Sequence, residues 1–295
     1  MHKKEPGNEA PIRVAIQGVE GAFHDMAARR YFSNQEIIIE PCHTFRDAFE
    51  SVNVQSADVA MVAIENSLAG SLLPNYTLLK NSGLIISGEI YLRIEQHFMA
   101  LPGQSIDDIT EVHSHPLAII QCEEFLEPLR KKGVKIIDTI DTALSAKYIS
   151  ENQLKGIAAL ASELAAGMYG LEIIGRGVET NKRNFTRFLS LATRETAAAL
   201  QRVKGIPNNK ASVSFTLPHQ TGSLSQILSV LAFYKLNLTK IQSAPIIGKD
   251  WEYYFYIDLL FEDYNMFSKA LAAVNPLTDQ LQVLGEYVSG LPKSI

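Results

Sequence analysis

The chain has 295 residues, and 46% of them are hydrophobic, so it can bury two or three separate cores. Its formal net charge of −5, with no run of Lys and Arg, argues against nucleic acid and anionic lipid as partners. The two cysteines, Cys42 and Cys122, belong to no CxxC or Cys/His cluster, which argues against a disulfide framework and a structural zinc site.

The N-terminal residues 1–10 are polar and lack the apolar core of a signal peptide, so we predict a short disordered tail there. No later stretch is apolar over the length that a membrane helix needs. We therefore expect a cytoplasmic protein with reduced thiols and no membrane partner.

From Pro11 onwards, short β-rich runs alternate with helical runs, which is the pattern of an α/β fold with a parallel sheet. A turn from Gly18 to Gly21 joins the first strand to the first helix. Backbone N–H groups at a helix N-terminus favour a carboxylate or a phosphate, although a simple tight turn explains these glycines equally well. The expected strands are 12–17, 37–39 and 59–64, and the expected helices are 22–32 and 45–52.

The third of these strands ends in Glu65-Asn66-Ser67. Ligands bind at the carboxyl ends of strands in open sheets, so Asn66 and Ser67 are candidates for bonding a carboxylate or a hydroxyl. Capping of the following helix explains Ser67 equally well. Glu65 leaves the core as a charged group and therefore needs a partner.

An extended stretch at 84–101 leads to a second lobe with the same rhythm, and we expect a cleft between the two lobes. Ser114-His115-Pro116 lies at a strand-to-helix junction, where Pro116 suits the first helical position and Ser114 is a candidate cap. His115 is interpreted as a turn residue and Cys122 as a buried, inert thiol. The expected strands end at 112 and cover 134–137 and 157–160, and the expected helices are 117–129 and 143–149.

Residues 184–188, Asn-Phe-Thr-Arg-Phe, begin another strand. Alternation along it places Thr186 and Phe188 on one face and Arg187 on the other. Arg187 either forms a bidentate pair with a substrate carboxylate or makes a structural salt bridge, and the residues alone slightly favour the salt bridge.

Residues 193–209 indicate a helical spacer followed by a loop, and we place a domain boundary there. The strand at 211–217 alternates apolar Val213 and Phe215 with polar Ser212 and Ser214. Further strands at 237–246, 251–260 and 280–288, with helices at 223–234 and 265–274, complete a βαββαβ unit of ferredoxin-like type over 210–290.

Taken together and in this order, these motifs resemble the prephenate dehydratases, and the C-terminal unit resembles an ACT domain. The motifs of the first resemblance are the Gly18-x-x-Gly21-x-Phe23 turn, Ile64-Glu65-Asn66-Ser67, Ser114-His115-Pro116 with Gln121-Cys122, Ala161-Ser162-Glu163-Leu164-Ala165, and the segment from Asn184 to Phe188. Those of the second are Gly222-Ser223-Leu224, Asn237-Leu238-Thr239-Lys240-Ile241 and Trp251-Glu252-Tyr253.

This resemblance implies a two-lobed catalytic domain at 11–192, with a fold like that of periplasmic binding proteins, and an ACT domain at 210–290. It implies a lyase that converts prephenate to phenylpyruvate, water and carbon dioxide in phenylalanine biosynthesis, without a metal or an organic cofactor. L-Phenylalanine is the implied effector, and a homodimer or homotetramer the implied assembly. Arogenate is the alternative substrate, and a non-catalytic anion-binding module with an ACT sensor is the alternative function.

The resemblance also implies roles for individual residues. Thr186 would donate a hydrogen bond to the departing hydroxyl. In the ACT segment, Gln242 and Ala244 stand where such domains commonly have Glu and Arg, and Ala22 and His24 replace hydroxyl residues of the first turn. The implied catalytic residues are Thr186, Glu65 and Asn66; the substrate-binding residues are Ser114, Gln121, Arg187, Phe188 and Gly21; the regulatory residues are Gly222, Ser223, Leu224, Asn237 and Leu238.

Overall fold

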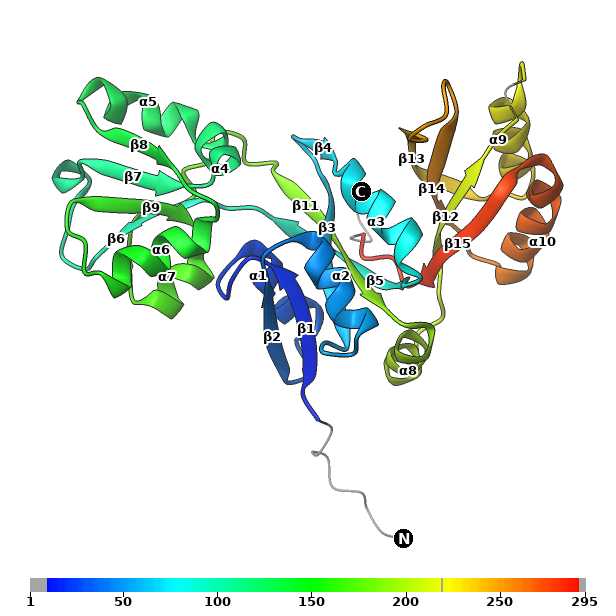
Figure 1. Ribbon diagram of the computed structural model, residues 1–295, viewed down its shortest axis with the longest axis horizontal. Coiled ribbons are helices and arrows are strands. Elements are labelled where there is room, and N and C mark those ends of the chain that lie inside the picture. Colours follow the sequence, from blue (N-terminus) through cyan, green and yellow to red (C-terminus); the bar gives the residue numbers. More distant parts are fainter. Residues whose placement is uncertain (1–9, 219, 292–295) are drawn as a thin grey trace, which may run out of the picture. The chain divides into compact units, whose positions relative to one another are not determined.

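The structure, a computed structural model, describes residues 10–218 and 220–291 (Figure 1). These residues form two compact units, one of residues up to 61 with 92–186, the other of 62–91 with the residues from 187 onwards. Strands β3 (Val59–Asn66) and β11 (Phe185–Ala192) each run from one unit into the other. Most of the predicted disordered tail lies outside the described residues, and the predicted boundary at 193–209 stays a prediction.

The first part of unit 1 is the strand, turn and helix predicted from the N-terminal pattern. β1 pairs in parallel with β2 and with the start of β3, and its central residues Val14, Ala15 and Ile16 are completely buried. Thr44 and Asp47 form a capping box that begins the second helix. The elements are β1 (Ile12–Gln17), α1 (Phe23–Tyr31), β2 (Ile37–Cys42) and α2 (Phe45–Asn53).

The second part of unit 1 is a sheet of strand order β10-β6-β9-β7-β8 with helices on both faces. Alternate residues of β9 divide between two cores, because Ala159 packs with α6 and α7 whereas Ala158 and Leu160 pack with α4 and α5. The strands are β6 (His97–Ala100), β7 (Glu111–Ser114), β8 (Lys135–Asp138), β9 (Ile157–Ala161) and β10 (Glu172–Gly175). The helices are η1 (Ile106–Asp108), α4 (Pro116–Gln121), α5 (Glu123–Lys131), α6 (Thr142–Glu151) and α7 (Glu163–Tyr169).

The helix predicted at 117–129 is instead two helices, since Cys122 leaves helical geometry with φ −107° and separates α4 from α5. The hydroxyl oxygen of Thr180 accepts a hydrogen bond from the Glu124 N–H at 3.3 Å, which satisfies one of the donors exposed at the new N-terminus. Pro116 opens α4 as predicted, but its cap is His115, whose Nδ1 accepts from Leu117 N, and not Ser114.

Unit 2 contains a four-stranded antiparallel sheet of order β13-β14-β12-β15, with α9 and α10 covering one face (Figure 1). This is the predicted ferredoxin-like arrangement, and Val213 and Phe215 face the helices as their alternation indicates. The opposite face, with Lys210 and Ser214, is buried as well. The elements are β12 (Lys210–Thr216), α9 (Ser223–Phe233), β13 (Asn237–Pro245), β14 (Tyr253–Leu260), α10 (Tyr264–Val274), η2 (Asn275–Leu277) and β15 (Asp279–Tyr287).

The remaining strands of unit 2 belong to a sheet of order β2-β1-β3-β11-β5, and β4 pairs with β3. β5 lies so close to β15 that a Cβ atom at Gly285 would overlap the backbone of Ile86, so only glycine fits there. α8 is the helical spacer expected at 193–209. The elements are β4 (Gly70–Ser71), α3 (Leu73–Ser82), β5 (Ile85–Arg93) and α8 (Arg194–Lys204).

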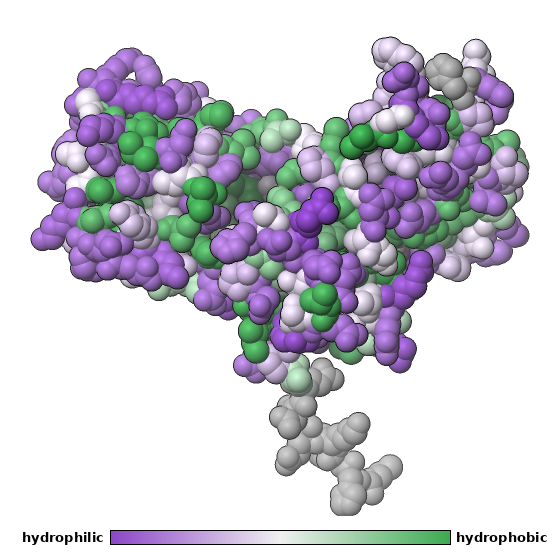
Figure 2. All heavy atoms as spheres, in the orientation of Figure 1, coloured by the Kyte–Doolittle hydropathy of each residue, from purple (hydrophilic) through white to green (hydrophobic). Residues whose placement is uncertain are grey.

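The surface mixes polar and apolar side chains. On the face drawn in Figure 2, hydrophilic residues are spread widely and hydrophobic ones form small separate groups. Within the part of the chain that the structure describes, no helix has both the length and the apolar character to cross a membrane.

Candidate active site

The Gly18–Gly21 turn is held by the second lobe of its own unit. The Ser162 hydroxyl donates to the Gly21 carbonyl at 2.5 Å, and the Tyr169 hydroxyl donates to the Glu20 carbonyl at 2.6 Å. Gly21 has φ +86°, and a Cβ on it would lie 3.0 Å from Ala165 Cα, so both conformation and space require glycine. The Ala161–Ala165 motif therefore connects the two lobes at this turn.

Gly21 does not offer its N–H to a ligand in this structure. That N–H donates to the completely buried Asp25 carboxylate at 2.8 Å, so the protein's own carboxylate occupies the position expected for a substrate anion. Arg29 balances the charge of Asp25 with a 2.7 Å contact from Nε. The geometry thus favours the tight-turn interpretation of Gly21 over substrate binding.

Ser114 is completely buried at the end of β7, and its hydroxyl donates to the Leu160 carbonyl at 2.7 Å. The hydroxyl proton therefore joins the ends of β7 and β9, and only the oxygen lone pairs remain to accept a bond. In this position Ser114 fixes the strand end from which α4 begins.

Gln121, at the end of α4, belongs to a buried polar cluster. Its Oε1 lies 3.4 Å from Nε2 of Gln96, whose backbone N–H donates to the Glu179 carboxylate at 3.0 Å. Glu179 is 1% exposed and also accepts from Arg93 Nη2 at 3.3 Å. Sequence patterns did not single out Gln96 and Glu179; the available signal was that Glu179 is the one carboxylate in a loop whose other charged residues are basic.

Thr186 lies at the start of β11 with 7% of its surface exposed, whereas Phe185 before it is 41% exposed. Asn184 is completely buried, and its carbonyl accepts from the Ile94 N–H at 2.8 Å. The 184–186 segment and Gln121 are therefore both bonded to the short connection 94–96. A buried hydroxyl held at a strand start is suited to polarise a leaving group.

Glu65 and Asn66, in unit 2, lie on the hairpin formed by β3 and β4. Asn66 is 6% exposed, and its Oδ1 accepts from the N–H groups of Leu68 and Ala69, each at 2.9 Å, which closes the hairpin turn. The carboxylate of Glu65 has the partner that its position demands, since Oε1 lies 2.7 Å from Lys240 Nζ. Because α3 begins only at Leu73, the interpretation of Ser67 as its cap is wrong.

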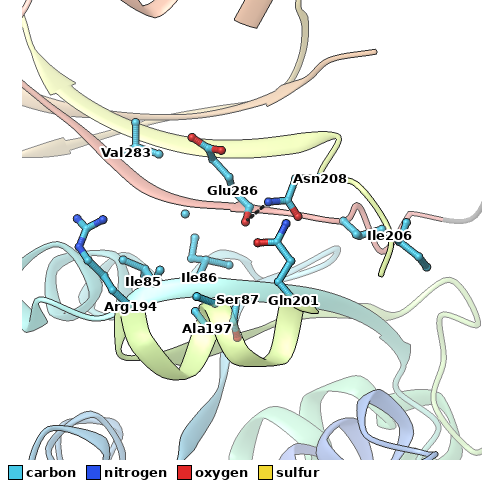
Figure 3. A pocket seen from close by; sticks show the side chains of 13 residues that line it. Ile85, Ile86, Ser87, Arg194, Ala197, Gln201, Ile206, Asn208, Val283 and Glu286 are labelled. Carbon is cyan, nitrogen blue, oxygen red and sulfur yellow. Dashed lines mark hydrogen bonds between the residues drawn. The ribbon is translucent and has the colours of Figure 1, made fainter. Parts of the chain in front are cut away.

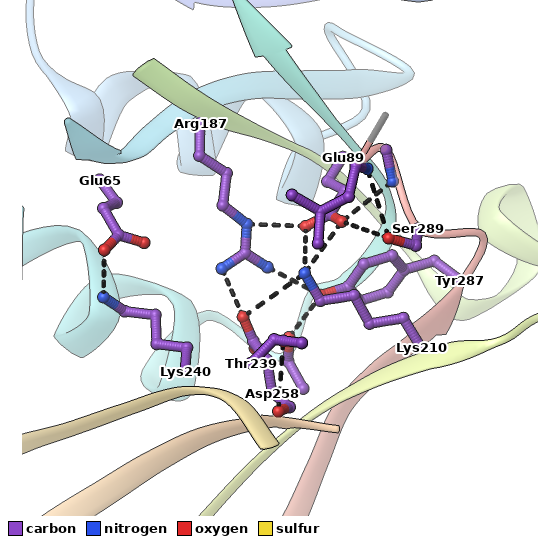
Figure 4. Close-up of polar contacts among 12 residues, drawn as sticks. Glu65, Glu89, Arg187, Lys210, Thr239, Lys240, Asp258, Tyr287 and Ser289 are labelled. Carbon is purple, nitrogen blue, oxygen red and sulfur yellow. Dashed lines mark hydrogen bonds and ion pairs between the residues drawn. The ribbon is translucent and has the colours of Figure 1, made fainter. Parts of the chain in front are cut away.

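Arg187 lies in a buried charged cluster within unit 2 (Figure 4). Its Nε lies 2.7 Å from Glu89 Oε2, Nη1 pairs with Asp258, and Nη2 donates to the Tyr287 hydroxyl at 2.9 Å. Lys210 Nζ lies 2.9 Å from both oxygens of Glu89. Every guanidinium nitrogen of Arg187 is thus bonded to the protein, and the geometry supports the salt-bridge interpretation rather than a substrate contact.

The cluster contains two cations and two carboxylates, which is how buried charges are tolerated. Burial opposes the ionised form of Asp258, but Arg187 and Lys210 outweigh it and lower the pKa of this carboxyl. Burial and the neighbouring Arg187 lower the pKa of the Lys210 ammonium. Burial, reinforced by Asp258, raises the pKa of the Tyr287 hydroxyl well above its usual value. Asp258 and Arg187 therefore stabilise each other's ionised forms.

The other candidates are apolar or inert. Phe188 is 1% exposed and belongs to the buried core. Burial raises the pKa of the Cys122 thiol to about 12 and also raises that of Cys42, so neither forms the thiolate that a nucleophile requires. No group of three His, Cys, Asp or Glu residues suited to a metal ion occurs among residues 10–218 and 220–291.

Three of the predicted regulatory residues line two pockets of the C-terminal sheet. Ser223 and Leu224 line a pocket with Trp251 and Tyr253. Asn237 lines a separate one with Asp263. Gly222, with φ +86°, is the residue before α9, and Leu238 packs on the core.

A further pocket, drawn in Figure 3, lies between β5, α8 and β15 and is lined by Ser87, Arg194 and Glu286 among others. None of the predicted site residues lines it.

Known proteins resemble this chain over most of its length. A family model described as prephenate dehydratase matches residues 14–196. Arogenate dehydratase 5, chloroplastic, of Arabidopsis thaliana is 38% identical over 301 residues, which is 96% of this chain and 68% of the relative. The bifunctional chorismate mutase/prephenate dehydratase of Aquifex aeolicus is 34% identical and covers 96% of this chain and 75% of its own length.

Two solved structures have a TM-score of 0.80 to this chain. One is a prephenate dehydratase in complex with L-Phe from Arthrobacter aurescens, 25% identical, covering 96% of this chain and 93% of its own. The other is GqqA, described as a novel type of quorum quenching acylase, 30% identical, with 94% and 98% covered.

The comparisons contradict one expectation. We expected a cytoplasmic protein, but several relatives from Arabidopsis thaliana, including arogenate dehydratases 5 and 3, are named as chloroplastic. Charge and hydropathy, on which the expectation was based, do not report the compartment, so the cytoplasmic assignment is withdrawn.

Proposed function

Because the chain belongs to the prephenate dehydratase family, we propose that it converts prephenate to phenylpyruvate, water and carbon dioxide. The observation that carries the proposal is the family match over residues 14–196, which includes every catalytic and substrate-binding residue implied by the sequence. Membership makes the chain a dehydratase of the lyase type, as predicted, and goes against the non-catalytic binding module.

The reaction needs little from the protein beyond placement and one polarising donor. The bond between ring C1 and its carboxylate breaks to release carbon dioxide, and its electron pair moves through the ring to expel the hydroxyl from C4. The departing oxygen takes a proton and leaves as water, and aromatisation drives the step. A donor at that oxygen lowers the barrier by stabilising the charge that develops there.

We assign that donor to Thr186, whose hydroxyl sits in a buried strand start. A threonine hydroxyl is a poor acid, so it polarises the departing oxygen rather than supplying a free proton. Asn66 and Glu65 are proposed to take part in the reaction as well, and Gln121 is proposed to bind substrate. Ser114 is proposed to shape the binding site through the ends of β7 and β9. Arg187 and Gly21 are proposed to support the fold, because their polar groups are bonded within the protein.

The test is turnover by Thr186→Val, which keeps the shape of the buried side chain but removes the hydroxyl. We expect kcat to fall about 100-fold, as for loss of one preorganised donor, with Thr186→Ser retaining most activity. Phenylpyruvate formation by Thr186→Val at the wild-type rate would refute this assignment.

Prephenate and arogenate differ by a keto group in place of an amine, and the same assay should offer both. The proposal expects the higher kcat/KM with prephenate; a higher value with arogenate would assign the alternative. The acylase among the structural relatives calls for a parallel assay of acyl-amide hydrolysis, for which the buried, protonated thiols of Cys42 and Cys122 provide no nucleophile.

We further propose that the C-terminal unit is an ACT domain that binds L-phenylalanine and associates into a homodimer or homotetramer. The L-Phe complex of the Arthrobacter relative supports the effector. One face of the C-terminal sheet is buried within the chain, so association is expected through edge strand β13 or the helices. Light scattering that gives a monomer with and without phenylalanine would contradict the assembly.

A further inference from the structure

Two charged contacts join the C-terminal sheet to the segments that carry the proposed catalytic residues. On β13, Lys240 Nζ lies 2.7 Å from Glu65 Oε1. On β14, Asp258 pairs with Arg187. Glu65 immediately precedes Asn66 in the sequence, and Arg187 immediately follows Thr186. Each contact therefore holds the neighbour of a proposed catalytic residue.

Both contacts are made by one pair of opposed residues in the sheet. Lys240 and Asp258 are directly opposite each other in the antiparallel pairing of β13 and β14. Opposed residues in such a pair lie about 5 Å apart and move together with their strands. A displacement of this residue pair would thus change the contacts with Glu65 and with Arg187 at the same time.

Lys240 contacts both arms of the hairpin that carries Asn66. Besides Glu65, its Nζ bonds the Ser71 hydroxyl at 2.8 Å, and Glu65 and Ser71 are themselves paired across β3 and β4. The lysine side chain is 12% exposed, and its Nζ lies 6.0 Å from the centre of the Tyr76 ring. Figure 4 shows Lys240 reaching Glu65 beside the cluster around Arg187. A long flexible side chain is thus fixed by two polar partners and one aromatic ring.

We propose that Lys240 is a positioning residue for the dehydratase reaction, holding the Glu65–Ser71 hairpin so that Glu65 and Asn66 are presented to substrate. The proposal rests on the proposed function, because it assumes that these two residues serve the reaction. The C-terminal sheet then supplies part of the active-site support as well as a regulatory site.

The same contact gives the proposed effector a route to the reaction. β13 begins at Asn237 and Leu238, two of the predicted regulatory residues, and the pairing with β14 shifts register between Leu238 and Lys240. A bulge of this kind bends the strand locally and can redirect the side chains next to it. Effector binding at Asn237 that alters this bulge would move Lys240 and loosen its hold on Glu65.

The experiment compares Lys240→Met, Lys240→Arg and the control Lys269→Met, an exposed lysine of α10, in the full-length protein. We expect Lys240→Met to lower kcat about tenfold, the usual effect of losing one charge-assisted hydrogen bond, with a small change in KM. Lys240→Arg should recover most of kcat because it keeps the positive charge. Half-maximal inhibition should need more phenylalanine in Lys240→Met than in Lys269→Met, and the three variants should melt at temperatures similar to that of the wild type.

The combination with Glu65→Gln separates positioning from general stability. If Lys240 acts through Glu65, the double variant loses no more kcat than the more severe single variant. Equal kcat and equal inhibition in Lys240→Met and Lys269→Met, with wild-type turnover intact, would overturn this inference alone. A wild-type protein without turnover of prephenate or arogenate would overturn the proposed function, and this inference with it.

Discussion

Replacement of Asp258 by asparagine tests whether the buried cluster holds unit 2 together. Asp258 is 6% exposed and balances Arg187 and Lys210 together with Glu89. In Asp258→Asn, two buried cations face a single carboxylate, and the Ser212 hydroxyl, 2.5 Å from Oδ1, loses a charged acceptor. The substitution changes the side-chain volume little, so the effect reports charge rather than packing.

The expected loss of stability is large. Removing one partner from a buried ion pair costs about 3–5 kcal/mol, because the remaining charge is left without compensation. Domains of this size lose about 2–4 °C of melting temperature per kcal/mol, so the midpoint should fall by about 10 °C. Adding Lys210→Met removes one cation, restores neutrality with the Arg187 and Glu89 pair, and should recover part of the loss.

Urea unfolding at pH 7 measures these differences, with Asp250→Asn in the exposed turn after β13 as the matched control. An unfolding free energy of Asp258→Asn within about 1 kcal/mol of that control would refute the reasoning. The pH dependence gives a second check. Because the folded protein lowers the pKa of Asp258, its stabilisation is present above the ordinary aspartate pKa and is lost as the pH falls through the lowered value. Asp258→Asn should lack this loss.

Two further predictions concern close packing and a histidine. Gly285→Ala places a Cβ against the Ile86 backbone and should lower the free energy of unfolding in urea by about 3 kcal/mol. The control Gly167→Ala, in an open position on α7, should be neutral or stabilising. Similar unfolding free energies for the two variants would contradict the packing argument. Burial lowers the pKa of His24, whose ring lies 5.4 Å from that of Phe45, to about 4, so stability should be lost as the pH falls from about 6.5 towards 4. The unfolding midpoint of His24→Phe should be less sensitive over this range than that of the exposed control His43→Phe, and equal slopes would contradict it.

Local patterns were sufficient to predict most of the elements. The alternation of Val213 and Phe215 correctly identified the face of β12 that meets the helices. Pro116 correctly marked the start of a helix, and the helix expected at 143–149 is α6, which Asp141 caps by accepting from Leu144 N. Elements without strong periodicity were missed, such as α3, whose Leu-Pro-Asn-Tyr-Thr sequence carries no regular apolar stripe. The break at Cys122 was also missed, because the donor at Glu124 is satisfied by Thr180, which is distant in sequence.

The partners of charged residues were beyond local patterns. The residues alone left Arg187 with two interpretations, and the choice depends on Asp258, 71 positions away. The partner of Glu65 is Lys240, at a separation of 175 positions. No window of sequence contains both members of either pair. Only folding into unit 2 brings them together.

The sequence nevertheless contained a signal for that packing. Lys210 opens a strand whose next apolar residues face the helices, and Asp258 interrupts the apolar run of β14. A sheet of this kind usually has one covered face and one face exposed to water. A lysine and an aspartate on the second face are compatible with solvent, but their burial is not, unless opposite charges from another segment meet them. Glu89 and Arg187 are those charges, so the polar face of the C-terminal sheet packs against β5 and β11 of the same chain. The proposed support of Glu65 by Lys240 comes from this same face, because Lys240 lies opposite Asp258 in the sheet.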